Sequence, residues 1–184
     1  MYIAVQLIVY AKKGFKIMKE INLSKATEFT SPNPLTLICS ENADGSTNLA
    51  PVCFVSYLSF NPPMFGFAMG KTSHTGKRVR ETGNVIITVP GSSLNEAVMF
   101  CGSTSGKDTK KVEEFKIDMQ EIPGTSIEIP TDTKLAFVAK LNQTVDTGDH
   151  YFYICDIENI MADETKEALF AWNGYTKAAP AQEK

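Results

Sequence analysis

The sequence holds few of the residues that build metal or disulfide sites. Four cysteines and two histidines occur among 184 residues, and no two cysteines form a CxxC pair. Neither His74 nor His150 is spaced from a cysteine, or from the other histidine, as zinc ligands usually are. We therefore expect reduced cysteines that pack as small hydrophobic side chains, and no metal site.

Long apolar runs and strong charge are also missing. The apolar segment from Tyr2 to Tyr10 is far shorter than the roughly 20 residues of a membrane span, and it has neither a basic region before it nor a cleavage site after it. With 18 basic and 21 acidic residues and no Lys/Arg run longer than two, the chain has no field that attracts nucleic acid. We expect a soluble cytoplasmic protein that binds neither nucleic acid nor membrane.

The length and the 43% hydrophobic content suit one domain with its own core. Met18 begins a segment of different composition, so residues 1–17 are predicted to be an N-terminal extension with Met18 as the natural start, and Tyr2 to Tyr10 an appended strand. Residues 18–184 then form the single domain. The intact mass of protein made in its own cell tests this division.

The stretch from Asn48 to Thr75 is the centre of the predicted fold. Its two apolar runs, Val52 to Leu58 and Met64 to Met69, are separated by a turn with two prolines, so we expect two strands. In the second run, small residues alternate with large ones and share one face, where a flat ligand has room. The small residues on this face are Gly66 and Ala68.

Other segments alternate between strand and short helix patterns. Strands are predicted over residues 35–39, 84–89, 135–145 and 150–161, the last two forming a hairpin around the turn at 146–149. Helices are predicted over 75–83, over 93–102 with a Ser93/Glu96 capping box, over 110–115, and over 163–172. About six strands in hairpin order favour a mainly β protein, an antiparallel barrel with a few short helices.

One loop carries a candidate phosphate site. Residues 70–77 approach the P-loop pattern GxxxxGK(S/T), but five residues separate the glycines and Arg78 replaces the magnesium-binding hydroxyl, which excludes a P-loop ATPase. Hydroxyls, lysines and the free N–H groups of a helix that begins at Thr75 still suit a phosphomonoester. A solvated polar loop explains the same residues equally well. Neither a GxSxG motif nor an acidic pair for acid–base catalysis occurs.

Four motifs, in order, resemble one family. NLAPVCFVSYLSFNPP, from Asn48, is similar to N-x-A-P-x-S-x-F…S-x-D-P-P, and residues 73–75 with 81–83 are similar to K-D-T…E-T-G. Residues 105–112 are similar to S-G-x-x-x-D-K-F, and residues 148–157 to G-x-H-x-x-F-x-G-E-V. From Pro34 to Tyr175 the chain thus resembles the flavin reductase-like, flavoredoxin-type FMN-binding split-barrel family.

The resemblance implies a split antiparallel Greek-key β-barrel that binds FMN and forms a homodimer with the flavin near the subunit interface. It also implies a site. The isoalloxazine would be edged by Asn48, Ala50, Pro51, Val52, Cys53 and Phe54. The ribityl chain would pass Ala68, Met69 and Gly70, and the phosphate would be bound by Ser73, Thr75 and Lys111. His150 would lie near the flavin edge or the nicotinamide as a catalytic residue; a strand-end histidine without a role is the alternative.

This chain departs from the family pattern at positions that touch the implied site. Ser73 replaces a common Lys, Cys53 a Ser, Val112 a Phe, Asn61 an Asp and Cys155 a Gly. The contacts to the phosphate and the packing over the flavin are therefore expected to differ from the usual ones.

Three functions follow from the resemblance and the residues. The first is an NAD(P)H-dependent flavin or ferric reductase, with NADH or NADPH as a transient donor. The second is a flavoredoxin-like electron carrier that holds FMN and is reduced by a redox partner protein. The third is a non-enzymatic barrel that binds a phosphorylated ligand. The absence of a GxGxxG motif does not separate them, because the family binds NAD(P)H without one.

Overall fold

The computed structural model describes residues 18–181. The predicted N-terminal extension and its appended strand therefore lie outside the described residues. The main element is a seven-stranded antiparallel sheet in the order β3-β2-β6-β9-β10-β5-β4. Its strands are β2 (Thr36–Glu41), β3 (Thr47–Val52), β4 (Val55–Phe60), β5 (Pro63–Gly70), β6 (Asn84–Pro90), β9 (Thr133–Thr147) and β10 (His150–Ala162).

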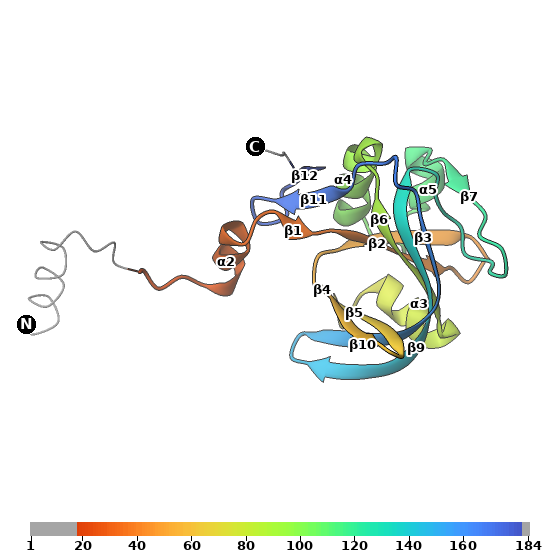
Figure 1. Cartoon of the computed structure of the whole chain (residues 1–184), viewed down its shortest axis with the longest axis horizontal. Coiled ribbons are helices and arrows are strands. Elements are labelled where there is room, and N and C mark those ends of the chain that lie inside the picture. Colours follow the sequence, from red (N-terminus) through yellow and green to blue (C-terminus); the bar gives the residue numbers. More distant parts are fainter. Residues whose placement is uncertain (1–17, 182–184) are drawn as a thin grey trace, which may run out of the picture.

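The sheet curls on itself around an inner core (Figure 1). This core joins side chains from both ends of the strand order, including Ile38 and Val52 on one side and Phe65 and Phe67 on the other, with Val79 of a helix among them. Residues from β2 and β5 meet in one cluster only because the sheet is curved. The prediction of a mainly β protein with an antiparallel barrel is confirmed.

The central stretch forms three strands, because the first apolar run is divided between β3 and β4 at Cys53 and Phe54. The predicted alternation in β5 is confirmed: Phe65, Phe67 and Met69 are buried in the inner core. Gly66 faces the other way, and a Cβ atom there would collide with the Phe152 ring. The absence of a side chain at this position permits close packing between β5 and β10.

Four helices and a 3-10 turn occur within residues 18–181. They are α2 (Leu23–Phe29), α3 (His74–Thr82), η1 (Ser92–Leu94), α4 (Asn95–Ser103) and α5 (Lys111–Phe115). Helix α3 ends at Gly83, which has a φ of 72°, as the sequence predicts. The predicted capping box is wrong: the Ser93 hydroxyl and N–H both donate to Asp132 Oδ2, at 2.6 and 2.9 Å, and α4 begins at Asn95.

A smaller sheet packs beside the barrel, where a helix was predicted over 163–172. Its strands, in the order β1-β11-β12, are β1 (Asn33–Pro34), β11 (Leu169–Trp172) and β12 (Lys177–Pro180). The helix prediction is wrong because Leu169 and Ala171 alternate with half-buried residues and enter an outer core shared with α4, which period-2 burial permits and a helix does not. A third pair joins β7 (Met119–Gln120) and β8 (Ile129–Pro130).

Helix α2 stands on the outside of the small sheet (Figure 1) and buries none of its residues. No helix within the described residues has the length and hydropathy needed to cross a membrane.

Candidate functional site

A cavity of about 500 Å³ lies between the barrel and the small sheet. Four parts of the fold enclose it: the β3–β4 junction, the end of β5, helix α4 and the β11–β12 hairpin. Its lining is mostly apolar, with one lysine and no carboxylate. The lining residues are Leu35, Pro51, Val52, Cys53, Phe54, Ala68, Met69, Gly70, Ser73, Val98, Met99, Gly102, Ser103, His150, Ala171, Tyr175, Lys177 and Ala178.

Strand pairing brings most of the predicted site residues to this cavity. Because β10 pairs antiparallel with β5 and places His150 opposite Gly70, the start of one strand and the end of the other reach the same rim. The predicted residues that line the cavity are Pro51, Val52, Cys53, Phe54, Ala68, Met69, Gly70, Ser73 and His150.

Three of the other predicted residues lie behind the cavity wall. Asn48 and Thr75 are buried, and the Asn48 amide donates to Thr75 Oγ1 at 2.7 Å, which ties β3 to α3. Asn48 Oδ1 has no hydrogen-bond partner within residues 18–181, and a Cβ atom at Gly106 would collide with it. Ala50 belongs to the inner core. These residues support the wall and do not line the cavity.

Lys111 is also absent from the cavity lining. Its side chain is only 5% exposed, and Nζ donates to the carbonyl oxygens of Leu49, at 3.0 Å, and Cys101, at 2.6 Å. Burial lowers the pKa of this ammonium group. The geometry therefore makes Lys111 a tie between α5, β3 and α4, where the resemblance implied a direct phosphate ligand. The resemblance did not indicate this role, because the two carbonyl partners belong to other elements and meet Lys111 only in the folded protein.

The N-terminal turn of α3 is rich in positive charge. Ser73 Oγ accepts a hydrogen bond from the Gly76 N–H at 3.2 Å, so Ser73 caps the helix while it lines the cavity. Burial lowers the pKa of His74, and repulsion by Arg78, Lys111 and Lys77 lowers it further. Ser73 thus brings the helix N-terminus, with its free N–H groups and dipole, to one corner of the cavity, while Lys77, Arg78 and Lys111 lie behind this corner and do not line it.

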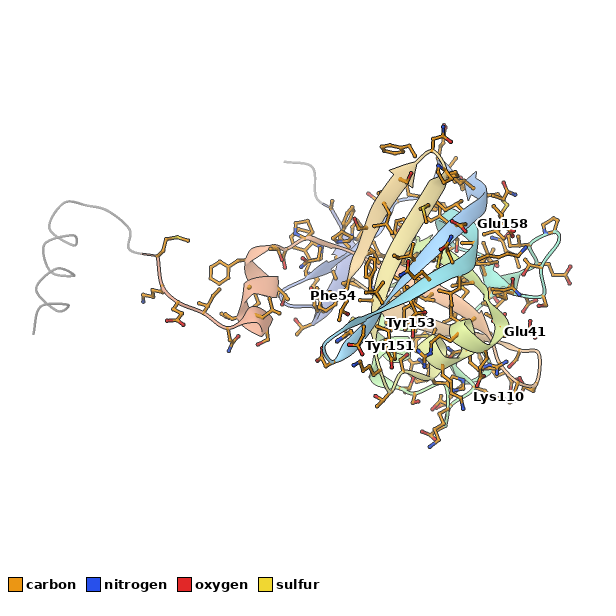
Figure 2. All side chains as sticks on the ribbon, turned by 90° about the horizontal axis from the view of Figure 1, so that it is seen from below. Glu41, Phe54, Lys110, Tyr151, Tyr153 and Glu158 are labelled. Atoms are coloured by element: carbon orange, nitrogen blue, oxygen red, sulfur yellow. The ribbon has the colours of Figure 1, made fainter. Side chains whose placement is uncertain are left out.

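The rim of the cavity is formed by three rings. His150 Nδ1 lies 2.7 Å from Asp149 Oδ1, and this hydrogen bond lowers the pKa of Asp149. The Phe54 ring lies 5.6 Å from the His150 ring and 6.0 Å from the Tyr175 ring, measured between centroids. In Figure 2 Phe54 lies beside β4 on the side of the barrel that faces the small sheet.

Cys53 forms part of the wall. Burial raises the pKa of its thiol to about 11, so it stays protonated near neutral pH. A protonated thiol is a weak nucleophile, and we assign Cys53 a packing role.

Sequence reasoning missed the residues that α4 and the β11–β12 hairpin bring to the cavity. The main ones are Met99, Gly102, Tyr175 and Lys177. The hairpin was overlooked because its first strand was predicted as helix. The sequence of β11, LFAW, is apolar at every position, so it carries no alternation that separates a strand from a helix.

Comparison with known proteins assigns the family. Residues 29–179 match the model of the flavin reductase-like domain, so the chain belongs to that family. A relative from Archaeoglobus fulgidus is 25% identical over 113 residues, which are 61% of this chain and 64% of the relative. The match thus spans less than two thirds of that relative's length.

Two solved structures share the fold. Flavoredoxin from Methanosarcina acetivorans has a TM-score of 0.78 at 20% identity, covering 92% of this chain and 94% of that one. The FMN-binding protein from Thermus thermophilus, with bound 1-cyclohex-2-enone, has a TM-score of 0.74 at 16% identity, covering 93% and 97%. The family resemblance and the split-barrel fold predicted from the sequence are confirmed. Family membership indicates a flavin-related role in electron transfer.

Proposed function

We propose that the protein binds FMN in the 500 Å³ cavity and acts as an NAD(P)H-dependent reductase of flavin or ferric complexes. The observation that carries this proposal is the shape and chemistry of the cavity. A wall of small side chains, from Pro51, Ala68 and Gly70, leaves room for a flat ring system, and the lining is mostly apolar. The volume lies within the usual range for sites that hold small cofactors.

The charged corner at α3 favours the phosphorylated flavin. Ser73 is the lining residue at the N-terminus of this helix, where unpaired N–H groups and the helix dipole attract an anion. Lys111, held behind the wall, adds positive potential without direct contact, because its ammonium group is already bonded to two carbonyl oxygens. Riboflavin, which lacks the phosphate, would gain nothing from this corner.

His150 is the residue we propose for the reaction. FMN, when bound, supplies the hydride and single-electron chemistry, and the protein supplies orientation and electrostatics. The Asp149 carboxylate fixes the ring of His150 through its hydrogen bond, with the ring exposed to the cavity. A fixed ring at this rim can orient a donor or stabilise charge that develops on the reduced cofactor.

Two other functions are tested by the same experiment. The second is a flavoredoxin-like FMN carrier reduced by a partner protein, which the shared fold with the flavoredoxin from M. acetivorans supports. The third is a non-enzymatic barrel that binds a phosphorylated ligand. The absorption spectrum of purified protein, saturated with FMN and then desalted to remove free flavin, shows whether flavin binds; a spectrum without flavin bands overturns the proposal. Bleaching of the flavin band by NADH or NADPH supports the reductase, and failure to bleach with both supports the carrier.

We also propose a homodimer formed through β4. This strand is one of the two edge strands of the seven-stranded sheet, and its apolar side chains Tyr57 and Phe60 are 61% and 93% exposed. A second copy is the expected occupant because Phe54, directly before β4, lines the cavity, so a partner on this edge also closes the site. Sedimentation should show a dimer and Phe60→Glu should weaken it; a wild-type monomer that binds FMN tightly contradicts this proposal.

A further inference from the structure

The tip of the β9–β10 hairpin, residues 146–149, leads directly into His150 at the rim of the cavity. Lys71, the residue after β5, contacts this hairpin tip through its backbone and through its side chain. We propose that Lys71 is a positioning residue for His150, because it fixes the hairpin tip that carries the histidine and the carboxylate bound to it. The inference rests on the proposed function, in which a fixed His150 ring takes part in flavin reduction.

The backbone contact holds Asp149. The N–H of Lys71 donates to the carbonyl oxygen of Asp149 at 3.0 Å, directly after the strand pair that Gly70 forms with His150. The backbone of Asp149 is thus bonded to the end of β5, while its carboxylate is bonded to His150 Nδ1. Because an ionised carboxylate only accepts hydrogen bonds, Nδ1 carries the proton when the His150 ring is neutral.

The side-chain contact holds the other end of the hairpin tip. Lys71 Nζ donates to Asp146 Oδ2 at 2.7 Å, and Asp146 Oδ1 accepts from the N–H of Gly148 at 3.3 Å. The hydrogen bond between the two side chains raises the pKa of Lys71 and lowers the pKa of Asp146, so both groups stay charged near neutral pH. One lysine therefore bonds to both ends of the tip, residues 146 and 149.

The opposite face of β10 is held by the same side chain. Successive residues of a strand face opposite sides, so the Tyr151 ring lies on the side away from the His150 ring. Two cations lie over the Tyr151 ring: Lys71 Nζ is 5.2 Å from its centroid, and Arg80 Cζ is 4.9 Å from it. Tyr151 also packs against the inner core. Lys71 thus contacts both chain neighbours of His150, Asp149 and Tyr151.

Cofactor binding and stability explain Lys71 less well than positioning does. Neither Lys71 nor Asp146 lines the cavity, and the ammonium group is already bonded to a carboxylate. The side chains of the pair are 35% and 64% exposed, and exposed ion pairs add little to stability. Such a pair can still restrict the positions that the hairpin tip adopts, and the rate of a reaction is sensitive to the orientation of the groups that take part.

The first test observes the His150 ring in the protein without flavin. The chain has only two histidines, so NMR signals of the ring nitrogens are assigned to His150 by their loss in His150→Ala. At about pH 9, above the ordinary pKa of histidine, the wild-type ring should carry its proton on Nδ1. Lys71→Gln and Asp146→Asn should each shift the ring toward a mixture of the two tautomers, and Lys71→Arg, which keeps the cation, should resemble the wild type.

Lys140→Gln is the matched control. Lys140 is an exposed lysine of β9 that pairs with Glu158 of β10 at 2.7 Å, so it joins the same two strands away from the hairpin tip. This variant should keep the wild-type tautomer. The inference is overturned if Lys71→Gln also keeps the wild-type tautomer, or if Lys140→Gln shifts the ring as much as Lys71→Gln does.

The second test is stopped-flow reduction of the FMN-loaded protein by NADH or NADPH. Lys71→Gln should lower the limiting rate about two- to fivefold, the factor that corresponds to the strength of an exposed ion pair, and leave the dissociation constants of FMN and of the nucleotide unchanged. Weaker FMN binding in this variant would make Lys71 a cofactor ligand and overturn the inference. An unchanged rate together with a shifted tautomer would contradict the proposed role of His150 in reduction and support its positioning by Lys71. If the wild type binds no flavin or is not reduced, the proposed function fails, and the NMR result alone decides whether Lys71 positions His150.

Discussion

The interior of the barrel and the rim of the cavity use aromatic rings in opposite ways. Inside, Phe67 and Tyr153 are fully buried and stacked nearly parallel, 4.9 Å apart and 4° from coplanar, and the Tyr153 hydroxyl accepts a hydrogen bond from Arg80. At the rim, Phe54 contacts His150 and Tyr175 at tilted angles and remains partly exposed. The interior rings are held on all sides, whereas the rim rings have a free side for a ligand.

The difference suggests that stability and ligand recognition are separated in this fold. The inner core is continuous from β2 to β10, and of its buried residues only Val52 and Met69 also line the cavity. The rim depends on elements far apart in the sequence, the β3–β4 junction, the start of β10 and the β11–β12 hairpin. Substitutions in one region are therefore expected to leave the main property of the other intact.

The largest expected effect is on stability. It is measured by making the same change, Phe to Ala, once in the inner core and once at the rim of the cavity. Phe67→Ala should lower the free energy of unfolding by about 3–5 kcal/mol, the range for a large ring removed from a packed core. Phe54→Ala, the matched change at the rim, should cost about 1 kcal/mol or less, because that ring is 45% exposed. Urea denaturation of both variants measures the difference; equal losses would contradict the separation.

The next largest expected effect is on the rate of flavin reduction. His150→Ala should slow flavin reduction by NADH or NADPH about tenfold or more, because the fixed ring at the rim is lost, while FMN affinity stays near that of the wild type. Stopped-flow absorbance at the flavin band gives the rate. Asp149→Asn separates fixation of the ring from its presence and should have the smaller effect. An unchanged rate in His150→Ala would show that His150 is a strand-end residue with no role in flavin reduction.

Ser73 provides a smaller and more selective effect. Ser73→Ala removes a hydroxyl at the charged corner and should weaken FMN by about 1 kcal/mol, with riboflavin almost unchanged. Thr72→Ala, at an exposed neighbour outside the cavity lining, is the control. Fluorescence titration with FMN and with riboflavin measures the two affinities. An equal loss of affinity for both flavins would show that the phosphate does not bind at this corner.

These residues also show how much of the site can be predicted from the sequence. The alternation in β5 and the position of His150 on the strand after the turn were predictable because period-2 alternation and motif spacing are local patterns. The start of α3 was predicted at Thr75, whereas the helix begins at His74 with Ser73 as its N-cap. The partners of Lys111 were not, since two carbonyl oxygens on β3 and α4 become its ligands only after three elements pack together. Tyr175 and Lys177 were missed for a related reason: β11 is identified as a strand by its pairing with β1, a segment more than a hundred residues earlier in the chain.

The smallest predicted effect is a change in pH dependence. The pKa of His74 is lowered from 6.5 in the folded protein, so as the pH falls through 6.5 the unfolded chain takes up this proton first. Stability is therefore lost as the pH falls from about 7.5 toward 5.5, and the loss from this group stops below the folded pKa. His74→Gln should reduce the change in the urea midpoint between these pH values; an identical change in variant and wild type would show that His74 contributes nothing.

The most direct test of the account is to fill the cavity. Ala68 lies on its wall, at the end of β5, and a large side chain there occupies the space proposed for the flavin. Ala68→Trp and wild type would each be saturated with FMN, desalted, and compared by visible absorption, with thermal melting to show that both are folded. The account predicts flavin bands in the wild type and none in the folded variant. A folded Ala68→Trp protein that retains FMN as the wild type does would contradict it.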